Sequence, residues 1–387
     1  MRKNENNDRL DRAFCKEIYC HRLYNPSFDT SKSRNLEFLP KTYKYFLSRL
    51  ECFVNELLSN DEIPFLPYLG TDGEKWYTPA SLAIKYFVSM PDFIDVVNRL
   101  SPKYAYSEPI NAFITCCHAM GLLSERLEWR HISNDSKKTD PRFGDVTAAE
   151  IFNTLVQAIR SEWKIKNLQA KVNARKQDVA DQKVDYCKYA DSLFCDRARL
   201  VLVRIDLFYE KQYGDSIDVF DMTKDLDRMF NNNARRNSLF AFMIGYIVKL
   251  EYGVDKGIHA HVLLFFDGSK RNNSSHIHLA EAIGKYWKYM ITKGRGAYWN
   301  VNAKAGRYDK LGRLGIGVIN WYDTDLRRNL TDFVVSYLCK EDQYFRSKWG
   351  PKVKLLRKGD FPEIPVTRRG APRKSVESYA GLSQILQ

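Results

Sequence analysis

The stretch that decides the fold of this chain is 257–266, Gly-Ile-His-Ala-His-Val-Leu-Leu-Phe-Phe, whose apolar run predicts a buried strand. Side chains alternate between faces along a strand, so His259 and His261 point the same way and can direct ring nitrogens at one point. A buried imidazole needs a polar partner. The pair predicts either a metal site or two hydrogen-bonded core histidines. The neighbouring residues distinguish these two interpretations.

A second predicted strand ends at Glu251, and the loop-like segment 253–257 separates it from the first. In a hairpin symmetric about Asp255, Glu251 lies opposite His259 on the same face, with Cβ atoms about 5 Å apart. A slip of one residue would move Glu251 to the other face. In the symmetric register, Glu251, His259 and His261 suit Mn²⁺ or Mg²⁺ with open positions for substrate better than a closed zinc site.

Residues 323–340 begin with capping residues and continue with helical periodicity. The inward stripe of this predicted helix reaches Tyr337, and Lys340 follows beside the same stripe. A tyrosine on such a stripe is usually part of the core, whereas a lysine there has no packing role unless it meets an anion. The two residues together favour a functional site.

The motifs His259-Ala260-His261 and Tyr337-Leu338-Cys339-Lys340 resemble those of the HUH endonuclease superfamily. In that superfamily a strand bearing His-hydrophobic-His holds a metal, and a later helix carries Tyr-x-x-Lys. The run 200–340 also resembles the replication-initiator branch found in filamentous phages and prophages, with 200–207 as its first motif strand.

This resemblance implies a rolling-circle replication initiator that nicks single-stranded origin DNA. Tyr337 would be the nucleophile, assisted by Lys340, and would leave a 5′-phosphotyrosine and a free 3′-hydroxyl. Glu251, His259 and His261 would hold the metal. Duplex origin DNA and a host helicase or polymerase are further partners consistent with this role.

Two residue assignments stay open, and so does the functional class. Asp206, on a strand that carries Arg204 and Asp206 where many relatives have threonines, competes with Glu251 as the acidic ligand. Tyr344 is a second candidate nucleophile, although it lies about 10 Å further along the helix axis. A transposase or relaxase of the same superfamily would use the same chemistry, and a DNA-binding regulator with a degenerate site would use none.

The composition favours a polyanionic partner. The net charge is +14, with 61 Lys and Arg residues, and nucleic acid is the natural candidate. No signal-like segment or membrane-length apolar stretch is present, so we expect a cytoplasmic protein without a membrane partner. The eight cysteines form no C-x-x-C pair, which favours reduced thiols over a zinc ribbon.

The chain is expected to contain a mainly helical domain of unknown role (1–160), a solvated connecting helix or linker (161–190), an endonuclease domain (191–350) and a poorly ordered basic tail (351–387). Within the endonuclease domain we predict strands at 200–209, 240–251, 258–266 and 315–321, and helices at 222–234, 275–292 and 326–345. This order predicts an α+β fold, a ferredoxin-like palm with a largely antiparallel sheet. The family resemblance implies the same fold.

Two further motifs carry predictions. The segment 275–278, Ser-His-Ile-His, repeats the His-x-His pattern but opens a helix, where residues i and i+2 lie about 200° apart and cannot readily chelate one ion. The segment 293–313 interleaves glycine, cations and aromatics such as Trp299, which suits single-stranded DNA. A flexible basic loop with packed aromatics is the alternative interpretation of that segment.

Overall fold

The structure is a computed structural model. It describes residues 41–71, 73–98, 100, 104–123, 144–214, 216–231, 238–253, 257–271, 276–340, 345–347 and 354–363. None of the helices within these ranges combines the length and the apolar content that crossing a membrane requires.

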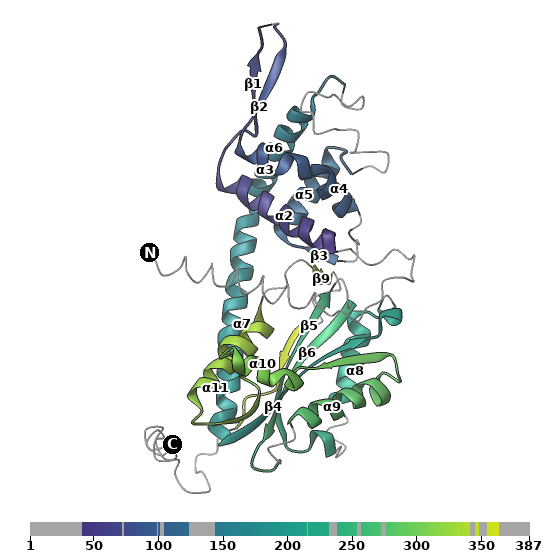
Figure 1. Cartoon of the computed structure of the whole chain (residues 1–387), viewed down its shortest axis with the longest axis vertical. Coiled ribbons are helices and arrows are strands. Elements are labelled where there is room, and N and C mark those ends of the chain that lie inside the picture. Colours follow the sequence, from purple (N-terminus) through teal and green to yellow (C-terminus); the bar gives the residue numbers. More distant parts are fainter. Residues whose placement is uncertain are drawn as a thin grey trace. The chain divides into compact units, whose positions relative to one another are not determined.

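The described residues between 41 and 165 are mainly helical, as their apolar spacing predicts (Figure 1). Its core is built on aromatic rings: Phe53 contacts Phe93, Phe113 and Phe152 at centroid distances of 6.0, 6.4 and 5.7 Å. The elements are α2 (Lys41–Ser59), β1 (Phe65–Leu69), β2 (Lys75–Pro79), α3 (Ser81–Tyr86), η1 (Phe87–Ser89), α4 (Met90–Asn98), β3 (Tyr104–Tyr106), α5 (Glu108–Ala119) and α6 (Ala148–Ile165).

The long helix α7 (Leu168–Asp196) follows α6 after a break at Asn167, whose φ of 46° is left-handed. The middle of α7 is largely exposed, in line with a solvated connector. Its last turns differ from that prediction, because Tyr189 and Leu193 are buried against the sheet described below. The position of the domain boundary within 161–190 stays a prediction.

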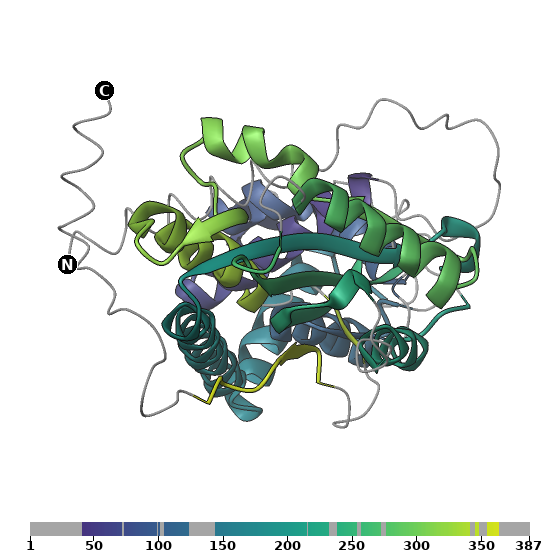
Figure 2. The ribbon, with the colours of Figure 1, turned by 90° about the horizontal axis from the view of Figure 1, so that it is seen from below.

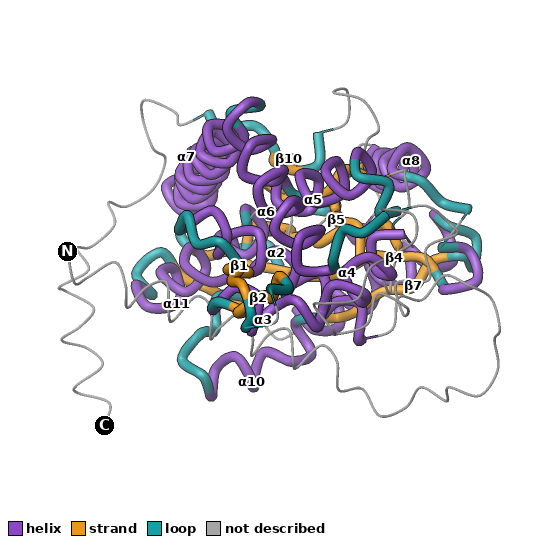
Figure 3. Tube along the Cα trace, turned by 90° about the horizontal axis from the view of Figure 1, so that it is seen from above, coloured by secondary structure: helices purple, strands orange, loops and turns teal. Residues whose placement is uncertain are grey.

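The remaining region is built on a six-stranded antiparallel sheet in the order β10-β5-β6-β4-β7, with β8 also paired to β4. Labels in Figure 3 follow this order from β10 through β5 and β4 to β7. The elements are β4 (Arg199–Tyr209), α8 (Val219–Asn231), β5 (Met243–Gly253), β6 (Gly257–Asp267), α9 (His276–Tyr286), β7 (Gly296–Asn300), β8 (Gly317–Asn320) and β10 (Leu356–Lys358). The fold is therefore mixed α+β, and the predicted antiparallel sheet is confirmed.

Helices cover both faces of this sheet (Figures 1 and 2). On one face, α8 and α9 pack on apolar side chains such as Val203 and Ile205. On the other, α7 and the helical segment 324–339 pack on Leu202 and Leu263. Side chains alternate faces along a strand, so Arg204, two positions after Leu202, also lies on this second face.

The helical segment 324–339 is not the continuous α-helix that the periodicity predicts. It consists of α11 (Thr324–Asn329), the π-helical turn η9 (Leu330–Val335) and α12 (Ser336–Cys339). A π turn contains one residue more than an α-helical turn, so the deeply buried positions after Leu330 are Val335, Leu338 and Cys339. Phe333 and Val334, which a regular helix would direct inward, are only half-buried.

This segment also ends earlier than predicted. Lys340 already has extended backbone angles, φ −59° and ψ 151°, so the expected end near residue 345 is wrong. Residues 345–347 instead form strand β9 (Phe345–Ser347), paired with β3. Tyr344 lies outside the described residues.

Two strands of the sheet are absent from the sequence prediction. The edge strand β7 forms within the segment interpreted as a basic loop, and β10 forms within the predicted basic tail. Both are short and of mixed polarity, so their pairing with β4 and β5 defines them rather than any hydrophobic period. Residues 364–387 of the tail lie outside the described residues. Shorter elements are η3 (Lys211–Tyr213), η5 (Ser238–Phe240), η7 (Trp287–Ile291), η8 (Asn302–Lys304) and α10 (Ala305–Lys310).

Candidate metal centre and its tyrosine

The β5–β6 hairpin has the symmetric register that the sequence predicts. Glu251 lies opposite His259, and Gly253 lies opposite Gly257. Gly257 has a φ of 59°, a conformation that glycine adopts without the steric cost of a Cβ atom. This register confirms that Glu251, His259 and His261 share one face of the sheet.

The three side chains converge on one point. One ligand atom from each lies within 4.8 Å of the others. Nε2 of His261 is 3.2 Å from Oε2 of Glu251, and Nε2 of His259 is 3.8 Å from the same oxygen. Both histidines are buried, and Glu251 is nearly so. Within the described residues, this is the group whose ligand types and spacing fit a metal ion.

Hydrogen bonds made by the two Nδ1 atoms fix the rings so that both Nε2 atoms face Glu251. Nδ1 of His261 donates to Oδ1 of Asp206 at 2.5 Å, and Nδ1 of His259 donates to the carbonyl of Gly257 at 3.2 Å. In the neutral imidazole each Nε2 then carries a lone pair directed at the Glu251 carboxylate. In this form the site presents three acceptors to one point, so the ligand set fits a divalent metal.

The pKa shifts are consistent with a ligand set that is deprotonated at neutral pH. Burial and the neighbouring His261 lower the pKa of His259 to about 3. Burial alone would raise the pKa of Glu251, but the neighbouring His261 and the charge of Lys340 hold it well below its usual range. A divalent ion therefore meets little competition from protons at these two groups.

Asp206 lies behind His261 and outside the converging triad. Its Oδ1 accepts from the far nitrogen of the ring and also from Nη2 of Arg204 at 3.4 Å. This is the arrangement in which an acidic group orients a metal-binding histidine from the outer shell. The geometry thus favours Glu251 over Asp206 as the direct acidic ligand. The sequence prediction noted Arg204 only as a departure from the family pattern, although its position two residues before Asp206 puts both on the site face.

Tyr337 lies directly over this cluster. Its ring is 5.5 Å from the ring of His261, centroid to centroid, at 76°. Nζ of Lys340 is 4.0 Å from the Tyr337 ring centroid and 3.8 Å from Oε1 of Glu251. The structure therefore brings all five predicted site residues together, although Lys340 reaches the site from beyond the helix end.

A row of side chains across the sheet connects the cluster to the edge strand. Lys249, His261, Asp206 and Trp299 are successive register partners on β5, β6, β4 and β7, and so share a face. Lys249 is buried, whereas Trp299 is 45% exposed. Nζ of Lys304 lies 5.8 Å from the Trp299 ring centroid.

The second His-x-His motif does not form a chelating pair. His276 begins α9, and its Nδ1 pairs with the side-chain amide of the buried Asn302 at 3.0 Å. His278 is exposed. This outcome agrees with the prediction that helical spacing separates the two rings.

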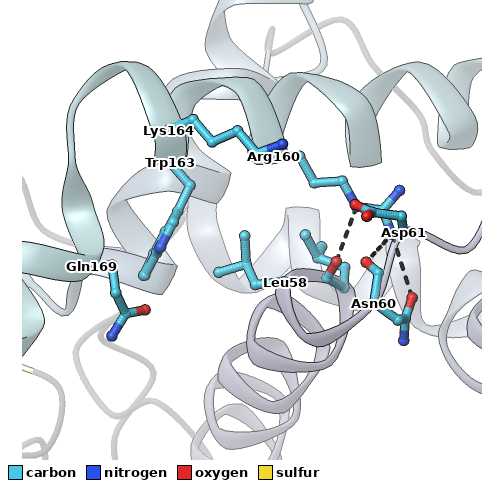
Figure 4. A pocket seen from close by; sticks show the side chains of 8 residues that line it. Leu58, Asn60, Asp61, Arg160, Trp163, Lys164 and Gln169 are labelled. Atoms are coloured by element: carbon cyan, nitrogen blue, oxygen red, sulfur yellow. Dashed lines mark hydrogen bonds between the residues drawn. The ribbon is translucent and has the colours of Figure 1, made fainter.

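The helical region holds a separate pocket of about 250 Å³, lined by Leu57, Leu58, Asn60, Asp61, Arg160, Trp163, Lys164 and Gln169 (Figure 4). Arg160 donates to the carbonyls of Leu57, Asn60 and Glu62 at 3.0, 2.8 and 3.0 Å. These bonds hold the chain that follows α2, so Arg160 has a structural role.

Residues 161–352 match the family model of the YagK/YfjJ C-terminal domain. The match takes in the whole candidate metal centre and Tyr337. The name of this domain specifies no activity. Comparison with curated proteins and with solved structures gave no match.

Proposed function

We propose that the chain is a metal-dependent nickase that cuts single-stranded origin DNA through Tyr337 and initiates rolling-circle replication. The observation that carries this proposal is the contact between Tyr337 and His261, which puts a tyrosine ring 5.5 Å from the ring of a candidate metal ligand. A buried metal centre paired with an adjacent tyrosine suits transesterification, in which the protein itself is the nucleophile.

The topology supports the resemblance to the HUH superfamily. The run β4-α8-β5-β6-α9-β7 is strand–helix–strand–strand–helix–strand, and its strand order β5-β6-β4-β7 is that of the ferredoxin-like fold. The His-x-His strand is one of the two central strands. The helical segment that carries Tyr337 packs on the same face as the histidines.

Glu251, His259 and His261 would hold the metal. Two imidazole nitrogens and one carboxylate suit Mn²⁺ at least as well as the oxygen-preferring Mg²⁺. When bound, the ion supplies Lewis-acid polarisation of a scissile phosphate. Outer-shell support comes from Asp206, which fixes the His261 ring so that Nε2 faces Glu251.

The chain's own residues perform the transfer. The phenol oxygen of Tyr337 forms a bond to phosphorus, and the bond from phosphorus to the 3′ oxygen breaks. The phenol loses a proton, and the departing 3′ oxygen gains one to become the 3′-hydroxyl. Lys340, beside both the ring and Glu251, stabilises negative charge at Tyr337 or on the phosphate. The phosphotyrosine retains the energy of the broken bond, which allows later rejoining.

The surface around the site suits single-stranded DNA. Trp299 offers an exposed indole on the metal face of the sheet, and Lys304 adds a cation beside it. Bases stack on such rings regardless of sequence, while cations follow the phosphates. The net charge of +14 favours the same class of partner.

Covalent capture tests the proposal. Purified chain, Mn²⁺ and a pool of single-stranded oligonucleotides tiling the DNA around its gene are incubated and separated on a denaturing gel. We expect a protein–DNA adduct that chelator and Tyr337→Phe abolish and that Tyr308→Phe, on α10, preserves. Peptide mapping of the adduct should locate the DNA at Tyr337. A linkage at Tyr344 would replace the nucleophile, and binding without any adduct would favour the regulator instead.

A further inference from the structure

Arg204 is a buried cation whose hydrogen-bonding capacity is largely unused. Its side chain is 7% exposed, and its guanidinium offers five N–H donors. Nη2 donates to Asp206 at 3.4 Å, whereas Nε is buried and has no hydrogen-bond partner among the described residues. Leaving buried donors unmatched costs stability, so such a group calls for an acceptor.

The guanidinium lies where the metal cluster and the tyrosine meet. Its Cζ is 5.2 Å from the Tyr337 ring centroid, and Asp206 connects it to the metal-binding ring of His261. Lys340 lies over the Tyr337 ring as well. Two cations therefore contact the ring of the proposed nucleophile.

Charge points in the same direction. Among the described residues, three cationic side chains, Arg204, Lys249 and Lys340, lie at this cluster with the carboxylates Asp206 and Glu251. A divalent ion would add two positive charges beside them, and an anionic phosphodiester would offset part of that charge.

We infer that Arg204 binds the phosphodiester that Tyr337 attacks. This inference rests on the proposed function and adds a substrate-binding residue to it. A guanidinium matches two phosphate oxygens at once through parallel N–H donors, which a lysine cannot do. Arg204 thus holds the phosphate beside the Tyr337 ring while Glu251, His259 and His261 hold the metal.

The alternative is that Arg204 only neutralises Asp206, and salt dependence separates the two roles. Binding of a thymidine oligomer is measured in Mn²⁺ over a range of salt, in the Tyr337→Phe background so that no adduct forms. Loss of one phosphate contact should reduce the slope of log affinity against log salt by about 0.7 in Arg204→Met. Arg271→Met is the matched control, because Arg271 also lies over a ring, that of Phe266, but donates to the carbonyls of Ala241 and Leu239.

Two further variants keep the test decisive. If Arg204 only neutralises Asp206, adding Asp206→Asn should restore wild-type affinity and slope to Arg204→Met when both proteins are saturated with Mn²⁺, and that rescue would overturn the inference. Should Arg204→Met fail to fold, Arg204→Lys retains the charge opposite Asp206. We then expect affinity for the oligomer to fall about tenfold with Mn²⁺ affinity unchanged, and unchanged oligomer affinity would reject phosphate binding.

These measurements are independent of nicking. An unchanged salt slope in Arg204→Met, together with a wild-type chain that forms adduct, contradicts this inference alone. A reduced slope in a chain that never forms adduct leaves Arg204 as a phosphate-binding residue and contradicts the nickase.

Discussion

Asp206 accepts a hydrogen bond from Nδ1 of His261 at 2.5 Å, on the side of the imidazole ring opposite Glu251. This bond selects the tautomer whose free Nε2 faces the other two ligands. Asp206 therefore acts on a metal through His261, while Glu251 offers its oxygens directly.

The two carboxylates should respond differently in a metal titration. Glu251→Gln removes a direct anionic ligand, so Mn²⁺ affinity should fall by more than about 100-fold. Asp206→Asn removes an outer-shell partner and should cost about 10- to 100-fold. Isothermal titration calorimetry of the folded variants measures both, and Glu281→Gln, on α9 outside the cluster, should bind as wild type. A larger loss in Asp206→Asn would reverse the assignment.

Acid should destabilise the metal-free protein through His259. Its pKa is about 3 in the folded chain because of burial and the neighbouring His261, against about 6.5 when unfolded. Between these values the unfolded chain binds a proton at His259 that the folded chain does not, so stability falls as pH drops below about 6.5.

In chelator, the urea midpoint should therefore fall from pH 7 to pH 5, a window in which ordinary carboxylates remain charged. His259→Gln should flatten this dependence, and His278→Gln, at an exposed position, should keep the wild-type profile. A profile for His259→Gln as steep as that of wild type would mean that other groups cause the acid sensitivity.

Lys340 should assist the reaction without being indispensable. Its ammonium lies 4.0 Å from the Tyr337 ring centroid and 3.8 Å from Glu251, so Lys340→Ala should slow adduct formation by about 100-fold. Mn²⁺ binding should be retained or become tighter, because a cation near the ligands is removed. The matched control is Lys288→Ala, since Lys288 pairs with Glu210. An unchanged adduct rate would limit Lys340 to packing on the ring.

The metal cluster was predictable because its geometry is local. Side chains alternate faces along a strand, which puts His259 and His261 on one face, and the glycines at 253 and 257 make the symmetric register the natural expectation. The structure has that register and so places Glu251 on the same face. The mixed α+β fold follows from the same periodicities. The role of Asp206 required the pairing of β4 with β6, a contact between residues 55 positions apart.

Other features depended on tertiary contacts. The π turn at Leu330–Val335 changes which side chains are buried, and the periodicity of the sequence does not predict this turn. Strand β7 forms because β4 offers an open edge, so a segment with loop-like composition becomes ordered. Arg204 and Lys249 are charged residues in strands that are otherwise largely apolar. Only the structure shows that both are buried beside the same cluster.

Trp299 should contribute directly to DNA binding. It is 45% exposed, lies next to Asp206 in the register of β7 on β4, and has Lys304 beside its ring. Stacking of one base on an aromatic ring is worth about 1–3 kcal/mol, so Trp299→Ala should weaken binding of a thymidine oligomer by roughly five- to hundredfold.

Fluorescence anisotropy in the Tyr337→Phe background measures this loss without adduct formation. Trp299→Phe retains a ring for stacking and should recover most of the affinity, whereas Lys304→Ala should mainly reduce the salt dependence because it removes a charge. Tyr289→Ala is the control, since Tyr289 is 62% exposed on the π-helical turn that follows α9. If Trp299→Ala and Tyr289→Ala bind equally well, the exposed indole is not a stacking site and the DNA takes another path across the sheet.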